Sequence, residues 1–351
     1  MRRWLAFWIT DMIYKEHLRF LTYPLSWFYG WGISLFHWLY DHKWWLQKYA
    51  PLPVVSIGNV VVGGVGKTQL VILLAKELND VAILSRGYRG KHEKGIKPTL
   101  VRPGTLVSDY GDEPCLLASR LPDIPVIVHR DRYKGALEAK RLGARLVLMD
   151  DGMQHRALHR EIEIVVLNGK DPWGGGHFLP RGRLREHPKR LKEADLIVFV
   201  GTPSLDTQKR VRSLTKAPWI EVEIVIREIR MLNETLITSL QGKRIGIFCG
   251  IGNPIRFAEN IQTLGGKIVK SFYLPDHYGM NEKELKQFAI FCKAKGAEYL
   301  VCTEKDRVKL PLSAASSPLP ICWAKAEFVI TKNQEAWNKM KKQITTLVGM
   351  I

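Results

Sequence analysis

Cysteine is scarce and unpatterned in this sequence of 351 residues. The five cysteines are scattered, and no two of them form a C-x-x-C pair. An odd, unclustered set argues against a disulfide framework and against a zinc site, and it favours a reducing compartment. The sequence also lacks internal repeats and low-complexity tracts, and 46% of its residues are hydrophobic. A chain of this length and composition can form two ordinary domains with packed cores.

Acidic side chains are also in short supply. There are 34 of them against 53 lysines and arginines, which gives a formal net charge of +19. Such an excess favours an anionic partner, which could be nucleic acid, a membrane surface or a phosphorylated substrate. A nucleic-acid-binding module is expected to interleave aromatic residues with a basic stripe. Here the aromatic residues crowd the N-terminus, away from the arginine clusters, so we predict no nucleic-acid partner.

The first 50 residues are unusually rich in tryptophan. Seven of the eleven tryptophans lie within the first 45 residues, and no side chain between Arg19 and Asp41 carries a full charge. The uncharged stretch is long enough to cross a bilayer, but a proline and two glycines interrupt it, and its Trp and Tyr favour the membrane–water interface. No signal-peptide cleavage site follows it. A buried helical hairpin is the alternative, but we predict a membrane anchor at residues 1–50, which either spans the bilayer or lies on it.

From residue 54 onward, short apolar runs alternate with helical patterns. Continuous apolar strands separated by helices are typical of a parallel sheet covered on both faces. The expected strands are at 54–57, 81–84, 126–129, 146–149, 164–167 and 196–200, and then at 244–249, 268–274, 299–303 and 320–324. Residues 219–240 alternate like connecting strands. We therefore predict an α/β fold, with a phosphate-loop NTPase-like parallel-sheet domain at 51–225 and a second, smaller α/β domain at 226–351.

A glycine-rich segment, GNVVVGGVGKT at residues 58–68, follows the first of these strands and precedes a helical pattern. Backbone N–H groups of such a loop, with a helix N-terminus behind them, form a cradle for phosphate. The pattern G-x-x-x-x-G-K-[ST] has glycine where Val61 stands, but the order of strand, loop and helix favours a nucleotide site over a structural turn. The predicted ATP-binding residues are Gly63, Gly64, Val65, Gly66, Lys67 and Thr68.

A second strand, LVLM, runs directly into Asp150 and Asp151. Doubly wound sheets bind ligands at the carboxyl ends of their strands, so paired acids there favour a site over solvated turn residues. The Thr68 hydroxyl and one of the two carboxylates are therefore predicted to hold Mg²⁺. The sequence leaves open which aspartate binds the metal directly.

Further polar strings occur along the chain, each of which taken alone could be an ordinary loop or helix end. They are SRGYRG (85–90), GDEP (111–114), DDGMQH (150–155), LPRGRLRE (179–186), GIGNPIRF (250–257), DHY (276–278) and TEKD (303–306). In this order, and together with the GGVGKT loop, they resemble the tetraacyldisaccharide 4′-kinases of lipid A biosynthesis. The resemblance covers essentially the whole chain, and Met153 is a small variation within DDGMQH.

This resemblance implies an ATP-dependent lipid kinase. Its substrate would be tetraacyldisaccharide 1-phosphate, phosphorylated on the 4′-hydroxyl to give lipid IVA for lipopolysaccharide. The enzyme would work as a monomer on the membrane surface, at the cytoplasmic face of the inner membrane of a Gram-negative bacterium. The alternative function is a membrane-associated phosphate-loop switch ATPase, which would turn over ATP without an acceptor.

The resemblance also implies roles for individual residues. Asp112 would be the catalytic base, assisted by His277, and Lys67 would stabilise charge on the γ-phosphate. An Asp–His pair suits proton transfer near neutral pH. Residues implied in contact with the substrate, or alternatively with the nucleotide, are Arg132, Arg185 and Glu186.

Overall fold

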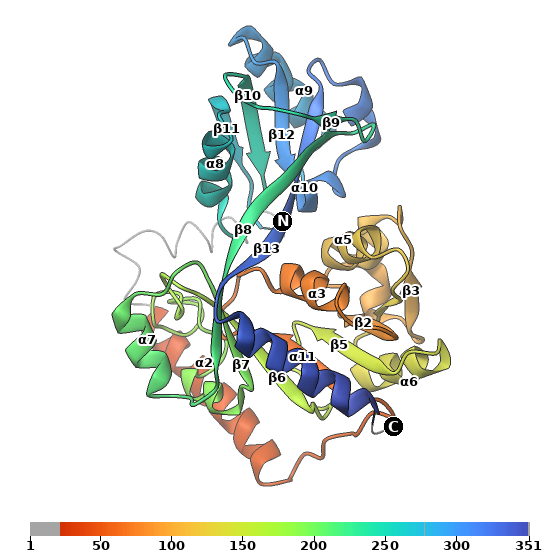
Figure 1. Ribbon diagram of the computed structural model, residues 1–351, viewed down its shortest axis with the longest axis vertical. Coiled ribbons are helices and arrows are strands. Elements are labelled where there is room, and N and C mark those ends of the chain that lie inside the picture. Colours follow the sequence, from red (N-terminus) through yellow and green to blue (C-terminus); the bar gives the residue numbers. More distant parts are fainter. Residues whose placement is uncertain (1–21, 277, 350–351) are drawn as a thin grey trace. The chain divides into compact units, whose positions relative to one another are not determined.

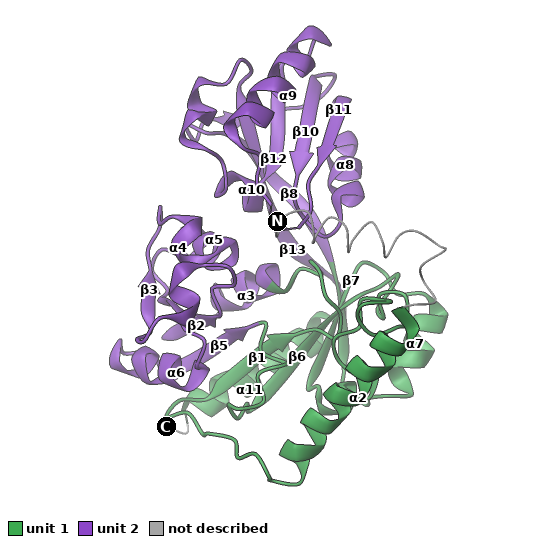
Figure 2. Ribbon diagram, turned by 180° about the vertical axis from the view of Figure 1, so that it is seen from behind, with its two compact units in different colours: residues 1–67, 151–222, 332–351 green, residues 68–150, 223–331 purple. Residues whose placement is uncertain are grey.

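Each apolar run that the sequence predicts as a strand is a strand in the structure (Figure 1). The structure is a computed structural model, and it describes residues 22–276 and 278–349. The strands alternate with helices, and most of them pair in parallel. The α/β fold class is therefore confirmed. The chain forms two units, which interleave along the sequence (Figure 2).

Unit 1 comprises residues 1–67, 151–222 and 332–351. Its elements are α2 (Thr22–Asp41), β1 (Val54–Gly58), β6 (Ile162–Asn168), η3 (Pro188–Glu193), β7 (Leu196–Val200), α7 (Leu205–Arg212) and α11 (Gln334–Gly349). Strand β6 lies between β1 and β7, and all three are parallel. Every residue of β1 and β7 is buried, as continuous apolar runs in a sheet covered on both faces require.

Unit 2 comprises residues 68–150 and 223–331, and it contains two groups of strands. The elements of the first group are α3 (Lys67–Ala75), β2 (Val81–Ser85), η2 (Lys91–Lys94), β3 (Thr99–Val101), α4 (Val107–Tyr110), α5 (Asp112–Arg120), β4 (Val126–Val128), α6 (Arg132–Arg141) and β5 (Leu146–Asp150). Strand β2 pairs in parallel with β4 and β5, and β3 is an antiparallel edge on β4.

The second group of unit 2 follows the order β11-β10-β12-β13-β8, with β9 paired to β8. Its elements are β8 (Trp219–Met231), β9 (Leu236–Ile237), β10 (Arg244–Cys249), α8 (Pro254–Thr263), β11 (Lys267–Tyr273), α9 (Glu282–Ala294), β12 (Tyr299–Thr303), α10 (Glu304–Arg307), η4 (Leu312–Ser316) and β13 (Ile321–Lys332). Strand β8 begins in unit 1 and continues into unit 2. The domain boundaries predicted at residues 50 and 225 stay predictions.

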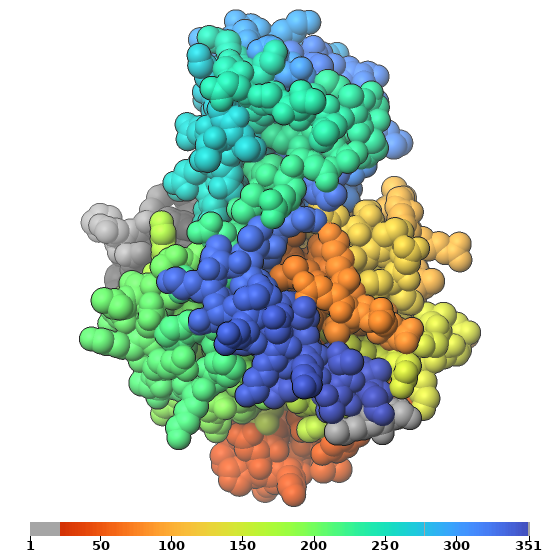
Figure 3. Space-filling model, viewed as in Figure 1, coloured from red at the N-terminus to blue at the C-terminus, as the bar shows by residue number. Residues whose placement is uncertain are grey.

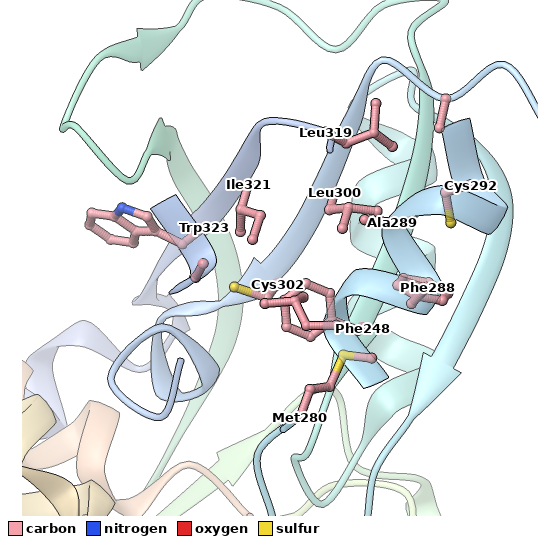
Figure 4. Packing of buried hydrophobic residues seen from close by; sticks show 13 residues of the cluster. Phe248, Met280, Phe288, Ala289, Cys292, Leu300, Cys302, Leu319, Ile321 and Trp323 are labelled. Carbon is pink, nitrogen blue, oxygen red and sulfur yellow. The ribbon is translucent and has the colours of Figure 1, made fainter. Parts of the chain in front are cut away.

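A buried cluster on this second group fixes the loop after β11. Phe248 of β10 and Phe288 of α9 lie edge to face in it, with ring centroids 6.3 Å apart. Met280, which follows the DHYG motif, belongs to the same cluster and lies next to Phe248 (Figure 4). The chain directly after the motif is therefore anchored in the core.

Helix α2 falls within the predicted membrane anchor, of which residues 1–21 lie outside the described residues. Across 22–276 and 278–349, no helix combines the length and the apolar content needed to span a membrane. Residues of α2 and of the loop that follows it lie at the surface in the space-filling view, coloured red (Figure 3). The anchor stays a prediction.

Candidate functional site

The phosphate loop has the backbone that its glycines predict. Strand β1 ends at Gly58, and helix α3 begins at Lys67. Gly63 and Gly66 have φ angles of +110° and +96°, in the left-handed region that favours glycine. No atom lies within 4 Å of the position that a Cβ would take on Gly63. The loop therefore leaves its backbone open to a ligand, as a phosphate cradle must.

Val61, the departure from the common motif, is a structural residue here. Its side chain is buried, and it forms an isolated β-bridge with Leu184. The next backbone N–H, that of Val62, donates to the Arg183 carbonyl at 2.7 Å. Val61 and Val62 thus bind the LPRGRLRE segment through the backbone, and the chain turns after them, at Gly63 and Gly66.

Lys67 is held by two oxygen atoms within unit 1. Its Nζ donates to Asn59 Oδ1 at 3.1 Å and pairs with Asp151 Oδ1 at 3.2 Å. The Asn59 amide donates in turn to the Val61 carbonyl at 2.7 Å. Asn59 is fully buried directly after β1, and the sequence patterns above do not single it out. Its position after a predicted strand, at the start of the glycine-rich segment, is the signal that indicates a role.

Asp151 sits in a strained backbone conformation, since its φ of +56° is unusual for a residue other than glycine. Both of its carboxylate oxygens accept from the Arg185 guanidinium, one of them at 2.9 Å. Partial burial opposes ionisation, yet Lys67 and Arg185 hold the pKa of Asp151 well below its usual range. The structure thus brings three predicted site residues together in one ionised cluster.

The Glu186 side chain does not join Arg185 at Asp151 but binds His37. Its carboxylate is almost fully buried, and Oε2 lies 2.5 Å from His37 Nε2 on α2. The Arg156 guanidinium donates to the His37 carbonyl at 3.1 Å and to Asp41 at 2.7 Å. The structure places Glu186 under α2, so the RLRE segment links this helix to the phosphate-loop cluster.

Asp112, the predicted base, is the first residue of α5 in unit 2 and is buried. One carboxylate oxygen accepts from the Glu113 N–H at 3.0 Å, and the other lies 3.5 Å from Lys305 Nζ. The turn before it is tight: Gly111 has a φ of +88°, and a Cβ there would lie 2.7 Å from the Tyr88 carbonyl oxygen. The GDEP turn therefore packs directly against the SRGYRG loop.

Three further predicted residues belong to unit 2. Asp150 ends β5 and is buried, and Thr68 lies in the first turn of α3. Arg132 begins α6, is buried, and donates to the His129 carbonyl at 2.6 Å, within its own turn. His277 lies outside the described residues. The roles assigned to these residues stay predictions.

A model of the family described as Tetraacyldisaccharide-1-P 4′-kinase matches residues 18–345 of this sequence. The chain belongs to this family. The tetraacyldisaccharide 4′-kinase of Chlamydia abortus is 43% identical over 292 residues, which are 81% of this chain and 79% of that protein. The protein of the same name from Syntrophus aciditrophicus is 36% identical over 326 residues, covering 86% and 87% of the two chains.

A solved structure agrees. The crystal structure of LpxK from Aquifex aeolicus in complex with ATP aligns with a TM-score of 0.72 and 30% sequence identity, over 94% of this chain and 99% of that one. The resemblance inferred from the motifs is therefore confirmed. Family membership also favours the kinase over the alternative of a switch ATPase.

Proposed function

We propose that this protein transfers the γ-phosphate of ATP to the 4′-hydroxyl of tetraacyldisaccharide 1-phosphate, giving lipid IVA. The observation that carries the proposal is the family match over residues 18–345, together with a phosphate loop whose backbone is open to a ligand. The structural relative with ATP bound supports ATP as the donor. The +19 charge suits an acceptor that already carries a phosphate.

On the donor side, we expect Lys67 to leave Asp151 and Asn59 and to bind a phosphate of ATP. Its Nζ is paired with Asp151 and hydrogen-bonded to Asn59, and both contacts lie at the base of the loop. An incoming phosphate would compete for this ammonium group while Arg185 continues to neutralise Asp151. Lys67 would then stabilise negative charge on the transferred phosphoryl group.

Mg²⁺ is expected beside the nucleotide. No group of three or more His, Cys, Asp or Glu that could hold a metal ion occurs in the described parts of the chain. A hard cation of this kind takes few protein ligands and completes its shell with phosphate oxygens and water. The Thr68 hydroxyl with the carboxylate of Asp150 or Asp151 fits that donor set. When bound, the ion would neutralise charge that develops on the phosphates.

On the acceptor side, we assign Asp112 as the base that accepts the proton of the 4′-hydroxyl, with His277 as its partner. The carboxylate is fixed at a helix start by the Glu113 N–H and by the Lys305 ammonium group. A fixed, ionised carboxylate is the state that a base needs before the hydroxyl arrives.

Helix α2 supports a membrane-facing role, because its amphipathicity is inverted. The residues it buries against the rest of unit 1 are small or polar, namely Thr22, Ser26, Gly30 and His37. Those it exposes include large apolar and aromatic side chains: Tyr23, Leu25, Trp27, Phe28, Trp31, Leu35 and Trp38. A contiguous exposed patch of this kind marks a protein or membrane contact, and Trp and Tyr favour the bilayer interface.

We therefore place the enzyme, as a monomer, on the cytoplasmic face of the inner membrane of a Gram-negative bacterium. An acceptor with four acyl chains resides in a bilayer, and ATP is available on the cytoplasmic side. Basic side chains of the protein would add attraction to anionic headgroups.

The test is transfer of ³²P from [γ-³²P]ATP to detergent-dispersed tetraacyldisaccharide 1-phosphate, with and without Mg²⁺. The expected result is Mg²⁺-dependent labelling of the lipid by the wild-type protein and its loss in Lys67→Ala. ATP hydrolysis without labelled lipid would overturn the proposal in favour of an acceptor-independent ATPase.

A further inference from the structure

The TEKD motif forms the short helix α10, which enters the function proposed above only through the contact of Lys305 with Asp112. Helix α10 directly follows the parallel strand β12 and is capped by Thr303, whose hydroxyl accepts from the Asp306 N–H at 3.2 Å. It lies beside α5, the helix that begins with Asp112 (Figures 1 and 2). The side chains of this motif bind segments from three other sequence motifs.

Lys305 stands among three carboxylates. Its Nζ lies 3.2 Å from Asp276 Oδ1, 3.5 Å from Asp112 Oδ2 and 3.8 Å from Glu113 Oε1. The side chain is only 16% exposed. Burial alone would lower the pKa of this lysine, but Glu113, Asp112 and Asp276 together raise it above the ordinary value. Lys305 therefore stays charged, and it contacts both the predicted base, Asp112, and Asp276 of the DHY motif.

The other end of α5 is bound to the same short helix. The Arg120 guanidinium pairs with Glu304 at 3.1 Å, and both side chains are nearly fully buried. Arg120 also pairs with Glu327 of β13 at 3.0 Å. Since both ends of α5 contact consecutive residues of α10, the helix has little freedom to turn Asp112 away.

Asp276 and Tyr278 of the DHY motif are each held by a lysine. Lys305 donates to Asp276, and Lys309 Nζ donates to the Tyr278 carbonyl at 3.0 Å. Lys309 is itself paired with Asp306 at 2.7 Å, and Asp306 accepts from the Gly250 N–H of the GIGNP turn at 2.9 Å. The TEKD helix thus organises the DHY and GIGNP motifs as well as GDEP.

We propose that Lys305 is a positioning residue for phosphoryl transfer. It holds the carboxylates of Asp112 and Asp276 in one place, and so sets where the base lies relative to the DHY loop. The inference rests on the proposed function, because it takes Asp112 as the base. Without the ammonium group, three acidic side chains would be left close together with no shared cation, and the Asp112 carboxylate would be displaced or would hold its proton.

The charged and titratable groups gathered around Asp112 come from three elements. Lys305 belongs to α10, Glu113 and Cys115 to α5, and Asp276 to the loop after β11. Asp109 of α4 acts on Cys115 and is itself paired with Lys91 at 2.9 Å. Most of these groups are acidic, so loss of the cation favours the protonated form of the base. The acidic limb of the pH–rate profile must then move to higher pH.

The experiment compares Lys305→Met and Lys305→Gln, which both remove the charge, with Lys305→Arg, which keeps it. The matched control is Lys243→Met, which breaks a 2.7 Å ion pair with Glu298 elsewhere in unit 2. For each variant, kcat and KM for ATP are measured in the lipid-labelling assay across pH, with a thermal melt to show that it is folded. If Lys305→Met does not fold, Lys305→Gln, which retains hydrogen-bond donors, carries the test.

Removal of the charge is expected to lower kcat on the order of 10²-fold, the scale of a misplaced reacting group. KM for ATP should stay near the wild-type value, because only an interaction of the transition state is lost. The acidic limb of kcat should move up by about one pH unit or more. Lys305→Arg should recover at least about tenfold in kcat, and Lys243→Met should match the wild type.

A folded neutral variant with a kcat within about threefold of wild type, or with an unmoved acidic limb, would overturn the inference. A wild-type protein that labels no lipid would overturn the proposed function instead. Lipid labelling by the wild-type protein therefore tells a failure of the inference about Lys305 from a failure of the proposed function.

Discussion

The outward aromatic face of α2 allows a quantitative prediction about membrane binding. Trp27 and Trp31 are 68% and 60% exposed, so their indole rings are available to a bilayer without any refolding. The perturbation is the double variant Trp27→Gln/Trp31→Gln. Both side chains are exposed, and neither belongs to the stripe that α2 buries, which is Thr22, Ser26, Gly30 and His37. The fold should therefore tolerate both substitutions.

The magnitude follows from the exposed area. A tryptophan side chain presents about 200 Å², so two thirds of it is roughly 130 Å² of surface available for burial. At about 25 cal/mol per Å², full insertion of both rings is worth about 6 kcal/mol. At an interface only part of this area leaves water, so we take half of that value, about 3 kcal/mol. The double variant should therefore bind membranes about 100-fold more weakly.

The assay is co-sedimentation with vesicles of phosphatidylethanolamine and phosphatidylglycerol at several lipid concentrations. The control is Ile96→Gln/Leu312→Gln, which removes two highly exposed apolar side chains from unit 2 and leaves α2 intact. The wild type, the double variant and the control should have similar melting temperatures, since exposed side chains contribute little to folding stability. If the double variant sediments with vesicles as the wild type and the control do, α2 is not the membrane contact.

Four other perturbations have definite outcomes. Lys67→Ala should lower kcat by about 10²–10³-fold in a protein that still unfolds cooperatively, with a somewhat lower melting temperature because Asp151 loses one of its two cations; full activity would refute the nucleotide assignment. Asp112→Asn should lower kcat by about 10²–10⁴-fold, the scale of a lost general base, and a near-normal rate in saturating substrate would exclude that role. Gly30→Leu should cost about 1–3 kcal/mol in urea unfolding, because its Cβ would lie 2.7 Å from the Phe178 ring; Gly32→Leu, with nothing within 4 Å, is the control and should unfold at the wild-type urea concentration or above it, since leucine favours a helix more than glycine does. Chelation of Mg²⁺ by EDTA should abolish lipid labelling, restored by excess Mg²⁺ but not by Na⁺; labelling that persists in EDTA would contradict the metal assignment.

Local sequence patterns determined the strands and the phosphate loop. The apolar runs at 54–57, 146–149 and 196–200 predict buried parallel strands, because each is a continuous stretch without polar alternation. The glycines before Lys67 predict the left-handed backbone that Gly63 and Gly66 adopt. Both signals lie within a few neighbouring residues, so a single sequence carries them.

The order of the motifs was enough to indicate the family, and hence the reaction. The same motifs could not reveal their own contacts. Glu186 and Arg185 are adjacent in the chain, yet one binds His37 under α2 and the other binds Asp151. Arg132, expected at the substrate, donates to a carbonyl within its own turn.

Only the tertiary structure decided which charges meet. Lys67 pairs with Asp151 and Lys305 with Asp112, in each case across long stretches of chain. The first pair meets because the parallel sheet returns the ends of distant strands to the same edge, and the second because α10 packs beside α5. Likewise, the inverted amphipathicity of α2 becomes visible only when Phe178 and Glu186 are placed against its polar side. The sequence determined the elements and the chemistry available to them, since these depend on local propensity. Long-range packing determined the partners, because a side chain's neighbours depend on where the rest of the chain folds.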